Sequence, residues 1–196
     1  MEINNKILPV LRPYGDDLDT NAIKEVIDSG WWGKGPKVAQ FEKEFAQMVG
    51  AKYAVAVSSA TAGLHLSYMA LSISEKRRVI TSPITFLSTS NAALYCNSMP
   101  LFSDIELETI NLSPSKLEDN LKKNKDIHCI SPVHFAGLPA NMKDIKFLAE
   151  KYNLKIGVVN FDPMPKMFFN KKLKNFRLSN IDQKIKLLSN LNVDFV

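Results

Sequence analysis

The segment SSATAGLH, residues 58–65, contains residue types that could bind a phosphorylated ligand. It follows the short apolar run YAVAV, and its small side chains leave backbone N–H groups exposed where a strand turns into a helix. Free N–H groups and the positive end of a helix dipole favour a phosphate at such a turn. The candidate residues are Thr61 and Ala62. The alternative interpretation is an ordinary helix cap formed by Ser59.

The three histidines and two cysteines are candidates for acid–base or metal chemistry. His134 follows an apolar strand pattern, and a histidine in that position is more often a hydrogen-bonded structural residue than an acid or a base. His65 and His128 carry less weight. Cys96 and Cys129 have apolar neighbours and a spacing that fits no metal motif. We therefore expect two buried thiols in a reducing compartment, and no metal site.

Alternating strand and helix patterns over residues 1–155 must position these side chains. Short apolar runs predict about five strands, at YAVAV, RRVITS, MPLFSD, IHCISPVHF and LKIGVV. Helix signals include Gly30 after the first amphipathic run, and Ser113 followed by Pro114 at the start of a later one. The alternation predicts an α/β fold with a mostly parallel sheet and helices on both faces. We expect an incomplete three-layer α/β/α sandwich with a short α/β tail.

Charge and hydropathy exclude several functional classes. The net charge of the 196 residues is +5, but basic and acidic side chains nearly balance over residues 1–155. The excess lies in a Lys- and Asn-rich stretch, 156–196, which is typical of a solvated loop rather than a nucleic-acid surface. No apolar run is long enough to span a membrane, and the first residues form no signal-peptide pattern. We expect a cytoplasmic protein that binds neither nucleic acid nor membranes.

Five ordered blocks give the sequence a specific resemblance. They are SGWWGKGPKVAQFEKEFA, YAVAVSSATAGLHLS, VITSPITFLSTSNAALY, FSDIELETINLSP and ISPVHFAGLPANM. In order and spacing they resemble the DegT/DnrJ/EryC1/StrS family, fold-type-I enzymes that use pyridoxal phosphate (PLP) to aminate keto-sugars attached to nucleotides. Within the family they are similar to transaminases that make UDP-4-amino-4,6-dideoxy-N-acetyl-β-L-altrosamine. The resemblance implies that residues 1–155 are the N-terminal half of a large domain whose ancestral substrate is a UDP-4-keto-6-deoxy sugar.

The resemblance assigns roles to individual residues. Thr61 and Ala62 match the turn that holds the cofactor phosphate, and Phe86 matches the aromatic residue that stacks on the cofactor ring. From the residue pattern alone, Phe86 would instead be a core residue of a helix. Trp31 and Trp32 match a loop for substrate and dimer contacts. The alternative for both tryptophans is a pair of surface aromatics in a flexible turn.

Two further anchors that PLP transamination needs have no match: a Schiff-base lysine and an acid that pairs with the pyridinium nitrogen. In the family the acid lies in a motif of the type EDAAH or EDAAQ, whereas this chain has LKIGVVNFDP, and the context of Asp162 does not match. No lysine of the tail stands in a matching motif. The sequence therefore predicts no catalytic residue, no transaminase activity and a PLP cofactor that is ancestral rather than retained. An open sheet edge predicts a homo-oligomer or an aggregate.

The tail, residues 156–196, resembles a second family, the adenylyltransferase module of bacterial riboflavin kinase/FAD synthetase. The blocks that carry this resemblance are IGVVNFDPMPKMFF and RLSNIDQKIKLLSNLNVDFV, with Met164 where the family has histidine. The resemblance implies a flavin pocket walled by Phe161, Pro163, Pro165 and Phe169. The phosphate-contacting GNFDGxHxGH segment of that family has no match.

Three functions remain open for what we interpret as a hybrid of two gene fragments, joined near residues 149–156. The first is an inactive transaminase remnant that still binds the PLP phosphate or a nucleotide-sugar. The second is a fragment of FAD synthetase, an FMN adenylyltransferase that uses FMN/FAD and Mg-ATP. The third is a non-catalytic partner of an intact transaminase, because fold-type-I enzymes build their sites across a dimer.

Overall fold

The computed structural model describes residues 15–156. These fall into two parts, 15–40 and 41–156, and each is described by itself. The predicted tail helix and the predicted flavin-pocket residues lie outside the described residues, and the predicted boundary between residues 155 and 156 stays a prediction. No helix within 15–156 is long and apolar enough to cross a bilayer.

The first part consists of helix α1, Asp17–Ser29, and the start of α2, Pro36–Val49. A capping box begins α1: the Asp16 carboxylate accepts from the Leu18 N–H, and the Asp19 carboxylate accepts from the Asp16 N–H. Gly30 ends the helix in the left-handed conformation, with φ at 74°, as the sequence predicts. None of the residues of α1 is buried.

The second part is built on a parallel sheet of four strands in the order β2-β1-β3-β4. The strands are β1 (Arg78–Thr81), β2 (Leu101–Phe102), β3 (Ile127–Ser131) and β4 (Lys155–Ile156). The helices are α3 (Ala60–Ala70), α4 (Ser88–Tyr95), α5 (Pro114–Lys123) and α6 (Met142–Lys151), with a short 3₁₀ turn, η1 (Phe135–Gly137).

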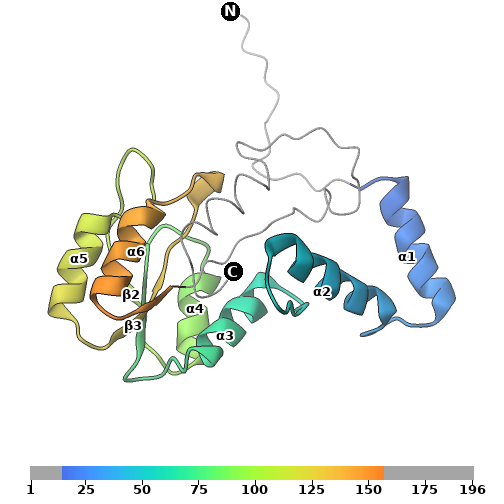
Figure 1. Ribbon diagram of the computed structural model, residues 1–196, viewed down its shortest axis with the longest axis horizontal. Coiled ribbons are helices and arrows are strands. Elements are labelled where there is room, and N and C mark those ends of the chain that lie inside the picture. The colour runs from blue at the N-terminus through green and yellow to red at the C-terminus, as the bar shows by residue number, and fades with distance from the viewer. Residues whose placement is uncertain (1–14, 157–196) are drawn as a thin grey trace, which may run out of the picture. The chain divides into compact units, whose positions relative to one another are not determined.

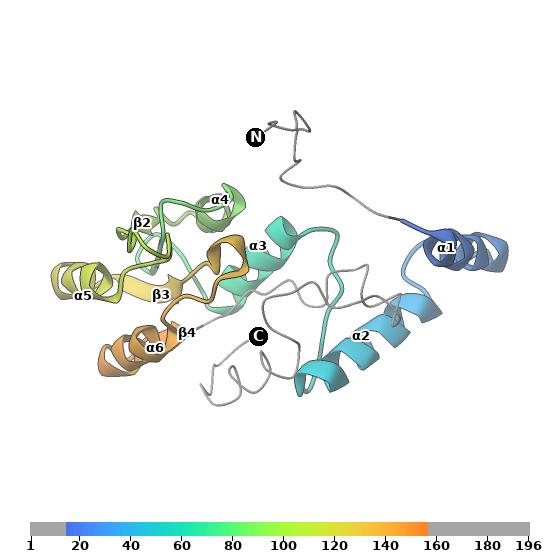
Figure 2. The same ribbon diagram turned by 90° about the horizontal axis from the view of Figure 1, so that it is seen from above.

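The sheet separates two hydrophobic clusters, because successive side chains of a strand point to opposite faces. Ile80 and Ile130 belong to the cluster shared with α5 and α6, whereas Val79 and Cys129 belong to the cluster shared with α3 and α4. Figures 1 and 2 show α5 and α6 on one side of the sheet and α3 and α4 on the other. The predicted α/β/α layering is confirmed, since the strands are covered on both faces.

Helix starts follow the predicted caps with one difference in detail. Ser59 caps α3, and its hydroxyl oxygen accepts from the Ala62 N–H at 3.2 Å. Pro114 opens α5 as predicted, but the side chain of the capping residue Ser113 makes no cap hydrogen bond. Its hydroxyl lies 3.1 Å from the Ser115 hydroxyl instead. Proline at the first helical position has no N–H to satisfy, which lowers the need for a side-chain cap.

The prediction of a buried strand at YAVAV is wrong. Residues 53–57 pair with no strand of the described sheet, and Tyr53 and Val55 are 75% and 72% exposed. Within the described part of the chain, the hydrogen bond of this segment runs from the Ala56 N–H to the Glu42 carboxylate, at 2.9 Å. Apolar periodicity marks a segment that is able to form a strand, but a strand also needs a neighbour to bond to.

An ion pair stabilises the amino end of the sheet. The Arg78 guanidinium contacts both carboxylate oxygens of Asp126, Nε–Oδ2 at 2.6 Å and Nη2–Oδ1 at 2.8 Å. The Arg78 N–H also donates to the Asp126 carbonyl at 2.8 Å. This bidentate contact joins the first residue of β1 to the residue before β3, and the hydrogen bond from Arg78 lowers the pKa of Asp126 below its usual range.

We expect Asp126→Asn to lower the free energy of unfolding at neutral pH by about 1 kcal/mol or less, since the pair is partly exposed. A lowered carboxylate pKa stabilises the fold above the unfolded value near about 3.9, and that stabilisation disappears as pH falls through the lowered folded pKa. The difference between variant and wild type should therefore shrink below about pH 4 in urea titrations. Asp119→Asn, which loses a 4.0 Å contact with Lys122, is the control. An equal effect of both variants would contradict the assignment.

Candidate functional site

The carboxyl ends of β1 and β3 lie side by side at a topological switch point. From β1 the chain continues through α4 to β2, toward one edge of the sheet. From β3 it continues through α6 to β4, toward the opposite edge. Ligands of open α/β sheets bind outside the strand ends at such a point. The final residues of the two strands, Thr81 and Ser131, are register partners.

Buried hydroxyl groups mark this edge of the sheet. The Thr81 hydroxyl donates to the Ser131 carbonyl at 2.7 Å, and both residues are buried. Beyond β1 the Ser82 hydroxyl oxygen accepts from the Ile84 N–H at 3.1 Å. Buried hydroxyls are tolerated when they are hydrogen-bonded, so these contacts fix the path of the chain as it leaves β1.

The N-terminus of α3 has free donors. The cap of Ser59 uses the Ala62 N–H, and the Ser59 carbonyl accepts from the Gly63 N–H at 3.0 Å. Within residues 15–156 no acceptor is bonded to the Ala60 or Thr61 N–H, and the first turn contains no acidic residue. Two N–H groups, the half-buried Thr61 hydroxyl and the helix dipole form a donor set that fits a phosphate. The cap and the phosphate interpretations are therefore compatible, with Ala62 already engaged by the cap.

Phe86 lies in the loop between β1 and α4. Its side chain is 79% exposed, and α4 begins only at Ser88. The interpretation of Phe86 as a helix core residue is therefore wrong, because the ring lies outside both hydrophobic clusters. An exposed ring in the loop that follows β1 is free to stack on a planar ligand.

Tyr68, in the last turn of α3, connects that helix to the strand ends. Its hydroxyl donates to the Thr89 carbonyl of α4 at 3.2 Å and lies beside the Ser131 side chain at the end of β3. Leu64 and Tyr68 pack in the same cluster as Val79 of β1 and Cys129 of β3, so α3 covers the two strands at the switch point. Tyr68 is not predictable as a site residue from the sequence, because an aromatic residue on an apolar helix face has the pattern of an ordinary core residue.

The histidine side chains described below have a hydrogen-bonded, stacked or buried position in the fold, and the two cysteines are buried or half-buried. The His134 Nδ1 accepts from the Ala140 N–H at 3.1 Å, which confirms the prediction of a hydrogen-bonded structural residue. His65 packs edge-on against Tyr95, with ring centroids 5.4 Å apart.

Burial lowers the pKa of His128 and raises that of the Cys129 thiol to about 12. Cys129 is buried and Cys96 half-buried, and both are free thiols. Among the described residues no three metal-ligating side chains gather.

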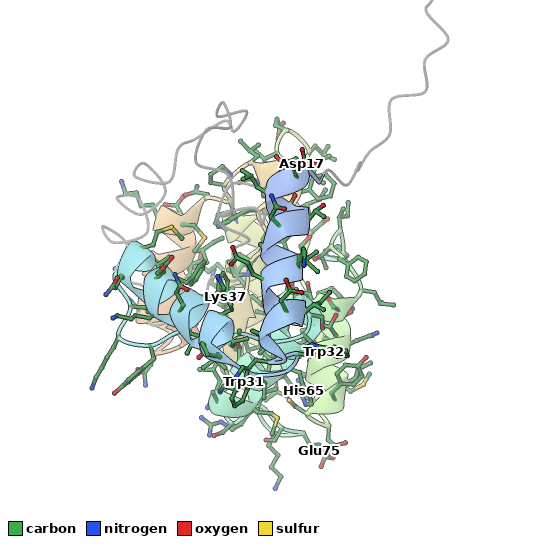
Figure 3. The ribbon with its side chains drawn as sticks, turned by 90° about the vertical axis from the view of Figure 1, so that its right-hand side faces the viewer. Asp17, Trp31, Trp32, Lys37, His65 and Glu75 are labelled. Atoms are coloured by element: carbon green, nitrogen blue, oxygen red, sulfur yellow. The ribbon has the colours of Figure 1, made fainter. Side chains whose placement is uncertain are left out.

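Trp31 and Trp32 lie in the first part of the chain, at the end of α1 opposite Asp17 (Figure 3). Both are exposed, and the Trp32 Nε1–H donates to the Ile27 carbonyl at 3.1 Å. A Cβ at Gly35 would lie 3.1 Å from the Trp31 Cβ, so the turn is tight enough to favour glycine there. Both tryptophans are thus surface aromatics in a turn, and a role in substrate or dimer contacts stays a prediction.

Comparison with known proteins places most of the chain in one family. The DegT/DnrJ/EryC1/StrS aminotransferase family matches residues 13–158. The spore coat polysaccharide biosynthesis protein SpsC of Bacillus subtilis is 43% identical over 150 residues, which cover 76% of this chain and 38% of the relative. The chain thus spans about two fifths of the length of that relative.

Solved structures agree. The aminotransferase from Psychrobacter cryohalolentis is 32% identical with a TM-score of 0.69, and the match covers 74% of this chain and 37% of that one. Helicobacter pylori PseC, an aminotransferase of pseudoaminic acid biosynthesis, is 28% identical with a TM-score of 0.68, covering 76% and 40%. The likeness again spans about two fifths of each known structure.

A second family, FAD synthetase, matches residues 136–196. The two matches overlap over residues 136–158, a stretch that contains α6 and β4. Most of the second match, including Phe161, Pro163, Pro165 and Phe169, lies outside the described residues.

Proposed function

This chain belongs to the DegT/DnrJ/EryC1/StrS aminotransferase family, and we propose that it carries the cofactor-phosphate turn and the ring-stacking residue of a nucleotide-sugar aminotransferase. The observation that supports this most strongly is the free donor set at the start of α3, Thr61 with its neighbouring N–H groups, on a helix that packs against the switch-point strands β1 and β3. Such a donor set binds a phosphate dianion without needing a lysine or arginine.

Two groups of this chain bind different parts of the cofactor in the proposed site. The first turn of α3 holds the phosphate of PLP, and the exposed ring of Phe86 stacks on the pyridine ring. Bound PLP supplies an electron sink for transamination. The residues of this chain bind and orient that group, while a lysine and an acidic ring partner are not matched within the 196 residues.

The proposed substrate class is a nucleotide-linked keto-sugar, specifically a UDP-4-keto-6-deoxy sugar. Support comes from the blocks shared with sugar aminotransferases and from the relatives, whose names refer to polysaccharide and pseudoaminic acid biosynthesis. Because the anchors for chemistry are unmatched, we propose that the chain alone binds ligand without turning it over, either as an inactive remnant or as a non-catalytic partner of an intact transaminase.

We expect the chain to bind pyridoxamine 5′-phosphate, which needs no covalent bond to lysine, and Thr61→Val to weaken that binding about tenfold. The reason is that a hydrogen bond to a charged group is worth about 1.5–3 kcal/mol. The matched control on the same helix is Ser67→Ala, because the Ser67 hydroxyl donates to the Gly63 carbonyl and makes no contact with the Ala60 or Thr61 N–H. Calorimetry with pyridoxamine 5′-phosphate measures both variants. Equal affinities for wild type and Thr61→Val would exclude this turn as the phosphate site.

We also expect no lysine of this chain to bond covalently to the cofactor, since none stands in the family's lysine motif. The measurement is peptide mass spectrometry after incubation with PLP and reduction with borohydride. Scattered low labelling of many lysines is the expected result, as for any exposed amine. Labelling of one specific lysine near one equivalent per chain would contradict the prediction.

A second candidate function is FMN adenylylation, favoured by the match of residues 136–196 to FAD synthetase. Adenylyl transfer depends on charge stabilisation at the phosphates, and the sequence lacks the histidine-bearing segment of that family. We therefore expect no FAD from FMN and Mg-ATP, and FMN binding no tighter than about millimolar. Chromatography of the reaction mixture is the assay. FAD above a no-protein control, lost in Phe169→Ala, would establish the second function.

A further inference from the structure

Tyr68 is a buried, titratable side chain to which the proposed function gives no role; its exposed fraction is 3%. We infer that the Tyr68 hydroxyl is a positioning group, which fixes the loop that carries Phe86 relative to the phosphate-binding helix α3. This inference rests on the proposed function, because it concerns how two parts of that site keep their spacing. The cofactor's phosphate and ring are joined covalently, so the residues that hold them must be held at a matching distance.

The contact path from α3 to Phe86 contains one intermediate residue. The Tyr68 hydroxyl donates to the Thr89 carbonyl at 3.2 Å. The Thr89 N–H in turn donates to the Phe86 carbonyl at 3.1 Å. The Thr89 carbonyl is therefore bonded to α3 through Tyr68, and the Thr89 N–H is bonded to the backbone of Phe86.

Further hydroxyl contacts make this junction rigid. The Thr89 side chain lies 3.0 Å from the Thr85 hydroxyl, which closes the loop around Phe86. The Ser131 side chain, at the end of β3, lies beside the Tyr68 hydroxyl. The Ser131 carbonyl accepts from the hydroxyl of Thr81, the last residue of β1. The junction therefore lies next to the ends of these two strands.

The hydroxyl adds a directional contact to an apolar junction. The α4 side chains in this cluster are Ala92 and Ala93, and Leu64 is the other buried residue of α3. Apolar burial is non-directional, whereas a hydrogen bond depends steeply on distance and angle. Burial raises the pKa of Tyr68 well above its usual range, so the hydroxyl remains a donor at all physiological pH values.

The first test needs no cofactor. Tyr68→Phe keeps the buried ring and removes the hydroxyl, so hydrogen exchange of the Thr89 amide should accelerate about tenfold while that of the Gly63 amide in the first turn of α3 stays within twofold. The matched control is Tyr95→Phe, since the Tyr95 hydroxyl is exposed and has no hydrogen bond within the described residues. Unchanged exchange at Thr89 would overturn the inference whatever the chain binds.

The second test separates ring binding from phosphate binding. We expect Tyr68→Phe to weaken pyridoxamine 5′-phosphate about tenfold, equivalent to about 1.4 kcal/mol, and to leave inorganic phosphate within twofold, because only the ring depends on Phe86. Equal losses for both ligands would show general loosening of α3 and overturn the inference. Unchanged affinity for both would overturn it as well.

Failure of the proposed function gives a different result, because wild type would then bind pyridoxamine 5′-phosphate no better than inorganic phosphate. That result would overturn the inference as well. If Tyr68→Phe does not fold, Ser131→Ala takes its place, since it removes the polar side chain beside the Tyr68 hydroxyl while leaving Tyr68 present. Ser131→Ala should give the same pattern, faster exchange at Thr89 and a selective loss of pyridoxamine 5′-phosphate, with smaller amplitude. A loss of neither would overturn the inference.

Discussion

The parallel pairing of β1 with β3 is the interaction on which the second part of the chain depends. β1 lies between β2 and β3, and its side chains supply both hydrophobic clusters, Val79 to one and Ile80 to the other. The same pairing brings Thr81 beside Ser131 and so creates the polar edge where the candidate site lies. A parallel sheet needs cover on both faces, and the helices that provide it are also the elements that carry Thr61 and lead on from Phe86. Stability and site geometry therefore share one set of contacts.

The sequence predicted those features that are determined locally. Ser59 as a cap, Gly30 as a helix end and Pro114 as a helix start are all correct, because each depends on neighbours within one turn. The errors concern long-range partners. YAVAV has strand composition but no described strand beside it, and Phe86 has helix-core periodicity but lies before the helix begins. Tyr68 was missed for the same reason, since its partner Thr89 is 21 residues away and no local pattern indicates it.

The overlap of two family matches over residues 136–158 has a physical explanation. α6 buries Met142, Ile145, Leu148 and Ala149 on one face, and β4 then joins β3 in parallel. Any doubly wound fold needs such an amphipathic helix followed by a parallel strand, so similarity in this stretch reflects a requirement shared by many α/β proteins. Membership of the DegT/DnrJ/EryC1/StrS family therefore rests on the residues matched before this stretch, 13–135.

The exposed segment 53–57 bears on the order in which parts of the chain fold. All four strands of the described sheet lie after residue 77, and each pairs with another of the four. Contacts between elements close in sequence form early, because little loop entropy is lost in closing them. The sheet can therefore form without contacts from residues 53–57, although these residues precede it in the sequence. Their strand-forming residues remain unpaired within the described part of the chain after the sheet has closed, so formation of this sheet does not depend on them.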